Sequence, residues 1–159
     1  MTRNIYIGFL AIVLIVGFFL FGYKKTNTPP LAEPAAQTAS FGGVSLKIEY
    51  AMTPETREQG FGGRKNIPSN YGMLFVFPKD GRYGFWMKDM LMPLDIFWLN
   101  SKGQVVYIAQ DVATSTYPNV FYPTELARYV LETAAGFAKV HTIATGTPLL
   151  LKSFPNVSQ

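Results

Sequence analysis

An uncharged apolar run of nineteen residues, from Ile5 to Tyr23, limits how much of this chain is left to build a folded domain. As a helix, a run of this length crosses a hydrocarbon layer of about 30 Å. Cleaved export signals have shorter apolar regions of about 7 to 15 residues, whereas this run continues to Lys24. We therefore predict a membrane anchor at residues 5–23 behind a tail at residues 1–4, with a cleaved signal peptide as the alternative.

The segment at residues 24–40 is rich in Pro, Ala, Thr and Ser and has no apolar period. Such a composition is typical of an extended tether. We predict a linker here and one domain at residues 41–159. The short tail before the anchor favours a cytoplasmic N-terminus. The expected location is therefore the cell membrane, with a single span at residues 5–23 and the domain on the extracytoplasmic side.

Charge and composition argue against several classes of function. The chain has 14 Lys and Arg against 10 Asp and Glu, and Arg3, Lys24 and Lys25 flank the apolar run. The rest is close to neutral and has no basic cluster, so we expect no nucleic acid as a partner. Cysteine is absent and His141 is the one histidine, which excludes disulfides and thiol catalysis and argues against a zinc site. We expect no metal and no cofactor.

The domain reads as short strands joined by turns. Strict alternation at residues 44–51 predicts a half-buried strand, and Thr53 followed by Pro54 predicts a short helix that stops at Gly60. Further strands are expected at 72–77, 82–88, 94–100, 104–110, 127–132 and 146–153, with a long loop at 111–126 and a second helix that begins at Thr133. We predict a mainly β fold, a compact β-barrel or jelly-roll-like single domain with two short helices, preceded by one transmembrane helix.

Motifs spread over this domain resemble those of a known family. The specific motif is "FWMKDMLMPLDIFWL" at residues 85–99, supported by "TPETREQG", "GMLFVFP", "ARYVLE" and "AGFAKVHTIATG". Together they resemble the domain of unknown function 192 family, also called uncharacterised protein family 0127, over residues 44–152. The resemblance implies a compact β-barrel or jelly-roll-like domain and brings no established activity. The chain departs from the family at residues 60–65, and it lacks the cysteine pair that many members carry after Asp111.

The charge of Asp95 falls on the apolar face of a predicted hairpin. If residues 82–88 pair antiparallel with residues 94–100, Asp95 shares a sheet face with Phe97 and Leu99. A desolvated carboxylate must find donors or take up a proton. The expected donors are backbone N–H groups or the guanidinium groups of Arg57, Arg64 and Arg128. Two interpretations stay open: a structural carboxylate that fixes a loop, and a functional acid in a cleft.

Other side chains extend this site. Lys88 is either a cation at a strand end or a ligand contact, and Trp86 is either core or a platform for a sugar or peptide. Arg128 and Glu132 lie about 13 Å apart along one strand face, so each must pair across strands. The predicted polar network comprises Arg57, Arg64, Trp86, Lys88, Asp95, Arg128 and Glu132, and its catalytic candidates are Asp95 and Glu132.

Three functions are compatible with these residues. The leading hypothesis is a non-catalytic accessory module that binds an envelope ligand or protein. The second is an enzyme that acts on envelope polysaccharide through Asp95 and Glu132 as a carboxylate pair, which must line one cleft roughly 5 to 10 Å apart. The third is an assembly partner of another membrane protein, which would use an exposed tip at Met90, Leu91 and Met92.

Overall fold

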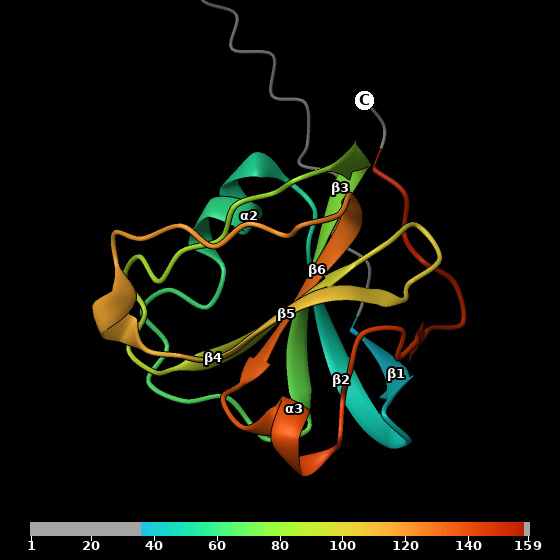
Figure 1. Ribbon diagram of the computed structural model, residues 1–159, viewed down its shortest axis with the longest axis horizontal. Coiled ribbons are helices and arrows are strands. Elements are labelled where there is room, and N and C mark those ends of the chain that lie inside the picture. The colour runs from blue at the N-terminus through green and yellow to red at the C-terminus, as the bar shows by residue number, and fades with distance from the viewer. Residues whose placement is uncertain (1–35, 158–159) are drawn as a thin grey trace, which may run out of the picture. The chain divides into compact units, whose positions relative to one another are not determined.

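The computed structural model describes residues 36–157, and a single seven-stranded sheet forms the frame of this part of the chain (Figure 1). The strand order is β5-β4-β6-β3-β2-β1-β7, with β2 and β3 parallel and the other pairs antiparallel. The elements are β1 (Gln37–Phe41), β2 (Val44–Ala51), α2 (Pro54–Gln59), β3 (Tyr71–Gly81), β4 (Leu94–Leu99), β5 (Val105–Val112), the 3-10 helix η1 (Thr114–Thr116), β6 (Ala127–Ala134), α3 (Phe137–Val140) and β7 (Leu149–Leu150). The prediction of a mainly β domain with two short α-helices is confirmed.

The predicted tail at residues 1–4, the anchor at residues 5–23 and most of the linker lie outside the described residues. Within residues 36–157, none of the helices has the length and apolar character needed to span a bilayer. The end of the predicted linker requires a correction, because Gln37–Phe41 forms β1. This strand contains few apolar residues and is too short to show a period, so composition alone assigned most of it to the tether.

The sheet curls until its two edges touch. The rings of Phe41 on β1 and Phe97 on β4 meet edge-to-face at 5.1 Å, although three strands lie between β1 and β4 in the sheet. The edges meet through a bridge between Gln104, before β5, and Pro148, before β7. Contact between edges satisfies backbone groups that an open sheet would expose. The predicted barrel or jelly roll is therefore a single curled, barrel-like sheet rather than two packed sheets.

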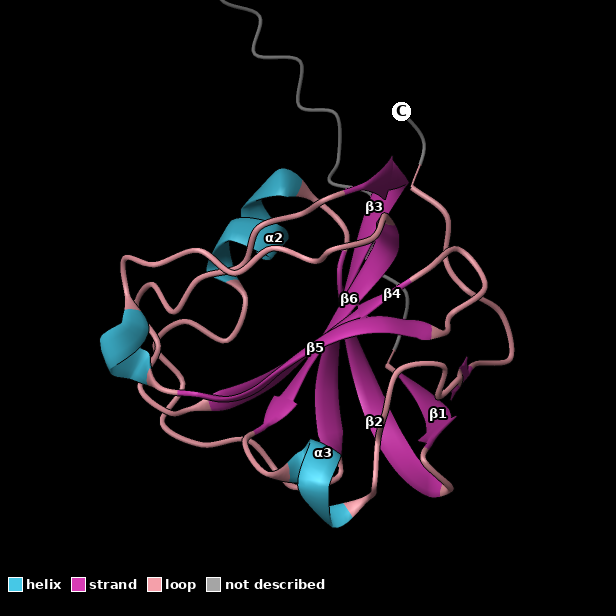
Figure 2. Ribbon diagram, viewed as in Figure 1, coloured by secondary structure: helices cyan, strands magenta, loops and turns pink. Residues whose placement is uncertain are grey.

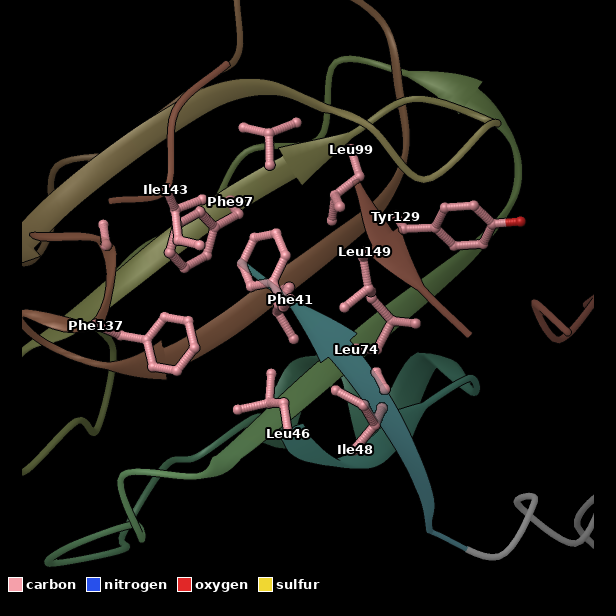
Figure 3. Close-up of a cluster of buried hydrophobic side chains, with 14 of the residues drawn as sticks. Phe41, Leu46, Ile48, Leu74, Phe97, Leu99, Tyr129, Phe137, Ile143 and Leu149 are labelled. Atoms are coloured by element: carbon pink, nitrogen blue, oxygen red, sulfur yellow. The ribbon is translucent and has the colours of Figure 1, made fainter. Parts of the chain in front are cut away.

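Both faces of the central strands β3, β4 and β6 are largely buried. Along β4, Phe97 and Leu99 point into the curl, while Ile96 and Trp98 point to the opposite face, and all of these side chains are fully buried. We call the apolar residues inside the curl the inner cluster, which Figure 3 shows, and those on the opposite face the outer cluster. The central strands therefore read as continuous apolar runs rather than as alternating ones.

The outer cluster is covered by α2 and by two long loops, at residues 82–93 and 113–126. The loops are joined by a pair of backbone hydrogen bonds between Phe85 and Phe121, at 2.9 and 2.8 Å, and Figure 2 shows them running side by side near α2. The Trp98 indole donates to the backbone carbonyl of Tyr83 at 2.8 Å and so ties the first loop to the sheet. These loops, rather than a second sheet, close the outer face.

The predicted hairpin between residues 82–88 and 94–100 is wrong. Residues 82–88 form a loop, and β4 pairs with β5 and β6. The alternation that suggested a strand has another cause, because Phe85 and Met87 are buried against the sheet while Trp86 and Lys88 face outward. A loop laid across an apolar face shows the same period as a strand over a few residues. The second helix also begins later than predicted, at Phe137, since Thr133 belongs to β6.

Asp95 fastens two segments to the inner face of the sheet. Its side chain is 0% exposed, and Oδ1 accepts the backbone N–H of Asp111 while Oδ2 accepts that of Ala138, each at 2.7 Å. Hydrogen bonds to an ionised acceptor stabilise more than bonds between neutral groups. Two backbone N–H groups therefore satisfy Asp95, and none of the three predicted arginines does. These bonds support the interpretation of Asp95 as a structural carboxylate that fixes a loop.

Replacing Asp95 by Asn tests this role. The substitution replaces one acceptor oxygen by an amide N–H₂ that faces one of the two backbone donors, so we expect the free energy of unfolding to fall by about 2 to 4 kcal/mol. Urea denaturation measures the change. The matched control is Asp80→Asn, at a partly exposed ion pair with Arg128, which should cost less than about 1 kcal/mol. Equal effects of the two substitutions would contradict the assignment.

Candidate functional site

A pocket of about 200 Å³ opens on the outer face of the sheet, between α2 and the loop at residues 82–93. Its lining contains as many polar as aromatic side chains. The aromatic lining is Phe61, Phe75, Phe77, Phe85 and Trp86, the polar lining is Arg57, Glu58, Gln59, Lys88 and Glu132, and the remainder is Pro54, Gly60, Gly84 and Met90. Aromatic walls combined with convergent polar groups are typical of a small-molecule site.

The position of α2 over the sheet follows from its own sequence. Thr53 caps the helix, since its hydroxyl accepts the N–H of Thr56 at 3.2 Å, and Pro54 occupies the first turn. Arg57 then ties the helix to the strands on either side, because its Nη1 donates to the carbonyls of Met52 and Val76 at 2.6 and 3.0 Å. These bonds hold α2 as the roof of the pocket.

Glu132 occupies the sheet side of the pocket. On β6 it lies opposite Met73 of β3 and Ile96 of β4, so it projects from the outer face among apolar neighbours. The residue is 4% exposed, and its Oε2 has no hydrogen-bond partner within the described residues. At Gly60, just past α2, an added Cβ would lie 3.8 Å from this oxygen, which shows how closely the end of α2 covers the carboxyl group.

Burial determines the protonation state of this carboxyl group. Desolvation raises the pKa of Glu132 to about 8, from the usual 4.5. No residue within 36–157 donates a hydrogen bond to Oε2 that would favour the charged form. At neutral pH the side chain is therefore mainly a neutral acid, which has one O–H to donate and oxygen lone pairs to accept.

Four of the seven residues predicted from the sequence meet at this pocket: Arg57, Trp86, Lys88 and Glu132. Trp86 is 44% exposed at the rim, so it is not core. Lys88 Nζ lies over the Trp86 ring, 6.0 Å from its centroid, and donates to Glu58 Oε1 at 2.7 Å. A charged rim therefore surrounds an apolar interior that holds one neutral acid.

The other three predicted residues lie elsewhere, each with its own partner. Arg64 makes a bidentate pair with Glu49, at 2.8 and 2.7 Å, and its hydrogen bonds hold the pKa of Glu49 below the usual value. Arg128 donates to Asp80 at 2.7 Å. Asp95 binds the two backbone N–H groups described above. The predicted single network is thus a pocket and three separate structural contacts.

The carboxylate pair considered from the sequence does not form. Asp95 lies opposite Thr133 across β4 and β6, while Glu132 lies opposite Ile96. Neighbouring positions on a strand project to opposite faces, so Asp95 enters the inner cluster and Glu132 the outer one. The two carboxyl groups are separated by the sheet itself and line no common cleft.

The tip predicted at residues 90–92 is only partly exposed. Met90 and Met92 pack against the outer cluster, while Leu91 is 56% exposed. Of the three apolar side chains predicted to form an assembly contact, only Leu91 is therefore largely exposed. Within residues 36–157, no three acidic or histidine side chains gather as a metal site requires.

Sequence reasoning missed the aromatic walls of the pocket. Phe75 and Phe77 belong to a run that predicted a buried strand, and Phe85 belongs to the supposed hairpin, so each was assigned to ordinary core. The available signal was Gly60, which ends α2 with a φ of +49° and where an added Cβ would already contact Phe75 and Glu132.

Comparison with known proteins agrees with the fold. Residues 36–151 match the model of DUF192, a family described as an uncharacterized ACR. The chain belongs to the DUF192 family. A UPF0127 protein of Thermococcus gammatolerans is 32% identical over 101 residues, and the chain spans 62% of the length of that relative, just under two thirds. The match covers 62% of the present chain as well.

Two crystal structures resemble this DUF192 domain. One, of a candidate transcription regulator from Sinorhizobium meliloti, is 28% identical, covers 74% of this chain and 95% of its own, and has a TM-score of 0.69. The other, of a protein of unknown function from Novosphingobium aromaticivorans, is 22% identical, covers 82% and 100%, and has a TM-score of 0.67. At that identity the second structure shows the fold alone.

Glu132→Gln tests the buried acid through the pH dependence of stability. In the wild type, the unfolded chain releases the proton of Glu132 near pH 4.5 and the folded chain near pH 8. Stability from this residue is thus fully present below pH 4.5 and is lost as the pH rises to 8, by on the order of 4 kcal/mol. Gln cannot ionise, so the variant should match the wild type at pH 4.5 and exceed it increasingly up to pH 8.

Urea denaturation at several pH values measures this difference. The control is Glu125→Gln, on an exposed loop, which should leave the wild-type pH dependence unchanged. A wild type and a Glu132→Gln variant whose stabilities stay parallel from pH 4.5 to pH 8 would refute the raised pKa.

Proposed function

We propose that this DUF192 domain is a non-catalytic binding module that takes a small ligand group into the Glu132 pocket. One observation carries the proposal: the buried Oε2 of Glu132, which has no hydrogen-bond partner among residues 36–157, lines an aromatic pocket that opens to solvent. Its volume of about 200 Å³ is below the roughly 300 to 1,000 Å³ of sites for drug-sized molecules. The pocket therefore suits one ring or end group of a ligand.

An energetic argument supports a ligand rather than a structural role for Glu132. A buried polar group without a hydrogen bond costs about 1 to 3 kcal/mol of folding free energy. Asp95 avoids this cost through two backbone donors, and Arg57 through two backbone carbonyls. Glu132 receives no such compensation from residues 36–157 at Oε2, so a ligand in the pocket is the partner that would supply it.

The proposed module acts at the cell envelope. The uncharged run at residues 5–23 supports an anchor, and the composition of residues 24–35 supports a tether to the domain. With the N-terminus inside, the pocket would face the extracytoplasmic side. Its ligand would then be an envelope component rather than a cytoplasmic metabolite.

A second candidate function uses the same acid as a proton donor in an enzyme. A carboxyl group with a pKa near 8 stays protonated at neutral pH, which suits a general acid. Glu58 also lines the pocket, but its carboxylate accepts a hydrogen bond from Lys88. Because the predicted partner Asp95 lies on the other face of the sheet, we favour binding without catalysis.

The two tryptophans provide a direct test of ligand binding. Trp86 stands at the rim of the pocket and Trp98 is fully buried with its indole N–H bonded, so their two indole NMR signals report on the pocket and on the core. Acetamide, acetate, tetramethylammonium and glycerol serve as neutral, anionic, cationic and polyol probes of the full chain in detergent micelles. We expect at least one to shift the Trp86 signal while the Trp98 signal stays.

Glu132→Met should abolish that shift, because it fills the site with an apolar side chain of similar length. The matched Glu125→Gln variant should bind as the wild type does. If no probe moves the Trp86 signal, or if Glu132→Met binds as well as the wild type, the pocket is not the binding site.

Protease accessibility tests the proposed location. In cells that express the full chain, a protease added outside an intact cytoplasmic membrane should cut the proposed tether, which is more accessible than the folded domain, and leave a membrane-bound fragment that contains residues 5–23. The physical reason is that the span shields only its own residues. Full-length chain that survives until the membrane is dissolved would reverse the proposed topology, and release of the domain without protease or detergent would remove the anchor.

A further inference from the structure

The rim of the pocket offers both hydrogen-bond donors and acceptors. Arg57 uses only its Nη1 for the two backbone carbonyls, and Lys88 uses one of three ammonium protons on Glu58, so both retain N–H groups to donate. Glu58 accepts from Lys88 through Oε1 alone, so its second carboxylate oxygen remains as an acceptor. The neutral Glu132 adds an O–H inside the pocket. A ligand that fits must therefore bring both oxygen acceptors and polar hydrogens.

Aromatic rings continue outward from the rim of the pocket. Trp86 packs against Tyr117, with ring centroids 6.5 Å apart, and the two side chains are 44% and 49% exposed. Tyr122, at 58% exposure, packs over Gly84, where an added Cβ would lie 2.6 Å from the tyrosine ring. We call Trp86, Tyr117 and Tyr122 the aromatic strip. It extends the surface available to a ligand beyond the pocket itself.

These features together favour one chemical class of ligand. A sugar ring carries hydroxyl oxygens that accept from N–H and O–H donors, and its C–H faces pack on aromatic rings. A tyrosine or tryptophan at a surface combines an apolar body with a polar end, which suits a ligand of this mixed character. The hydroxyl hydrogens of the sugar can in turn donate to an acceptor such as Glu58, which uses only Oε1 for Lys88.

We infer that the pocket binds the end unit of an uncharged oligosaccharide, with the sugar oxygens toward Glu132 and the next unit against the aromatic strip. This inference rests on the proposed function and names the ligand class of the same site. It also assigns separate roles to two residues. Glu132 recognises the unit inside the pocket, and Trp86 recognises the unit outside it.

The test uses the full chain in detergent micelles and the indole NMR signals of Trp86 and Trp98. The probes are glucose, N-acetylglucosamine and their β-1,4-linked trimers, with tetramethylammonium and N-acetyl-trialanine amide as representatives of cations and peptides. We expect a sugar to shift the Trp86 signal and not the Trp98 signal. The trimer of that sugar should bind about tenfold more tightly than its monomer, equivalent to about 1.4 kcal/mol.

Variants separate the two roles. Trp86→Ala should remove the advantage of the trimer while monomer binding, followed by backbone amide signals near Gly60, persists. Glu132→Met should weaken both sugars about tenfold or more, whereas Glu132→Gln, which keeps a donor and an acceptor, should bind within about threefold of the wild type. Glu125→Gln is the matched control and should change nothing.

The direction of the pH dependence decides the ligand class. The sugar affinity of the wild type should fall as the pH rises through 8, because ionised Glu132 loses its O–H, and that of Glu132→Gln should stay constant. Tetramethylammonium binding that strengthens with pH, or binding of the peptide alone, would overturn the oligosaccharide and leave the proposed binding function in place. If no probe of any class shifts the Trp86 signal, both the inference and the proposed function fail.

Discussion

The burial of both faces of β4 and β6 is the constraint on which the fold and the pocket depend. A sheet covered on one side can place its charges in water, whereas here every position of β4 is buried. A carboxyl group on either strand must therefore find a partner or keep its proton. Asp95, on the inner face, binds two backbone N–H groups and fixes the chain around it. Glu132, on the outer face, has no such donor at Oε2 within residues 36–157 and lies where a pocket admits a ligand.

The two carboxyl groups show how one physical requirement gives a structural and a functional outcome. Asp95 ties Asp111, at the irregular end of β5, and Ala138 of α3 to β4 on the inner side of the sheet. The outer face is covered by α2 and two loops rather than by a further sheet, and this cover leaves a gap of about 200 Å³ above Glu132. The two similar crystal structures support the fold, and the proposed function depends on this gap and its lining.

The sequence predicted strands and the capped helix α2 because these depend on local patterns, such as the alternation in β2 and the Thr53 cap of α2. It could not predict which strands pair: the contact between β4 and β6 joins residues 30 to 40 positions apart. The loop at residues 82–88 imitated a strand because it lies on an apolar face. The sequence placed Glu132 on one strand face with Arg128, but the burial of Glu132 depends on α2, whose position over the sheet comes from tertiary contacts of Arg57.

The most direct measurement is the ionisation of Glu132 itself. With carbon-13 at the side-chain carboxyl of glutamate, NMR follows each of the six Glu residues of the chain as the pH is raised. We expect one carboxyl signal that titrates near pH 8, far above the rest, and that disappears in Glu132→Gln. If no glutamate signal titrates above about pH 5, the carboxyl group of Glu132 is solvated or paired, and the pocket holds no neutral acid.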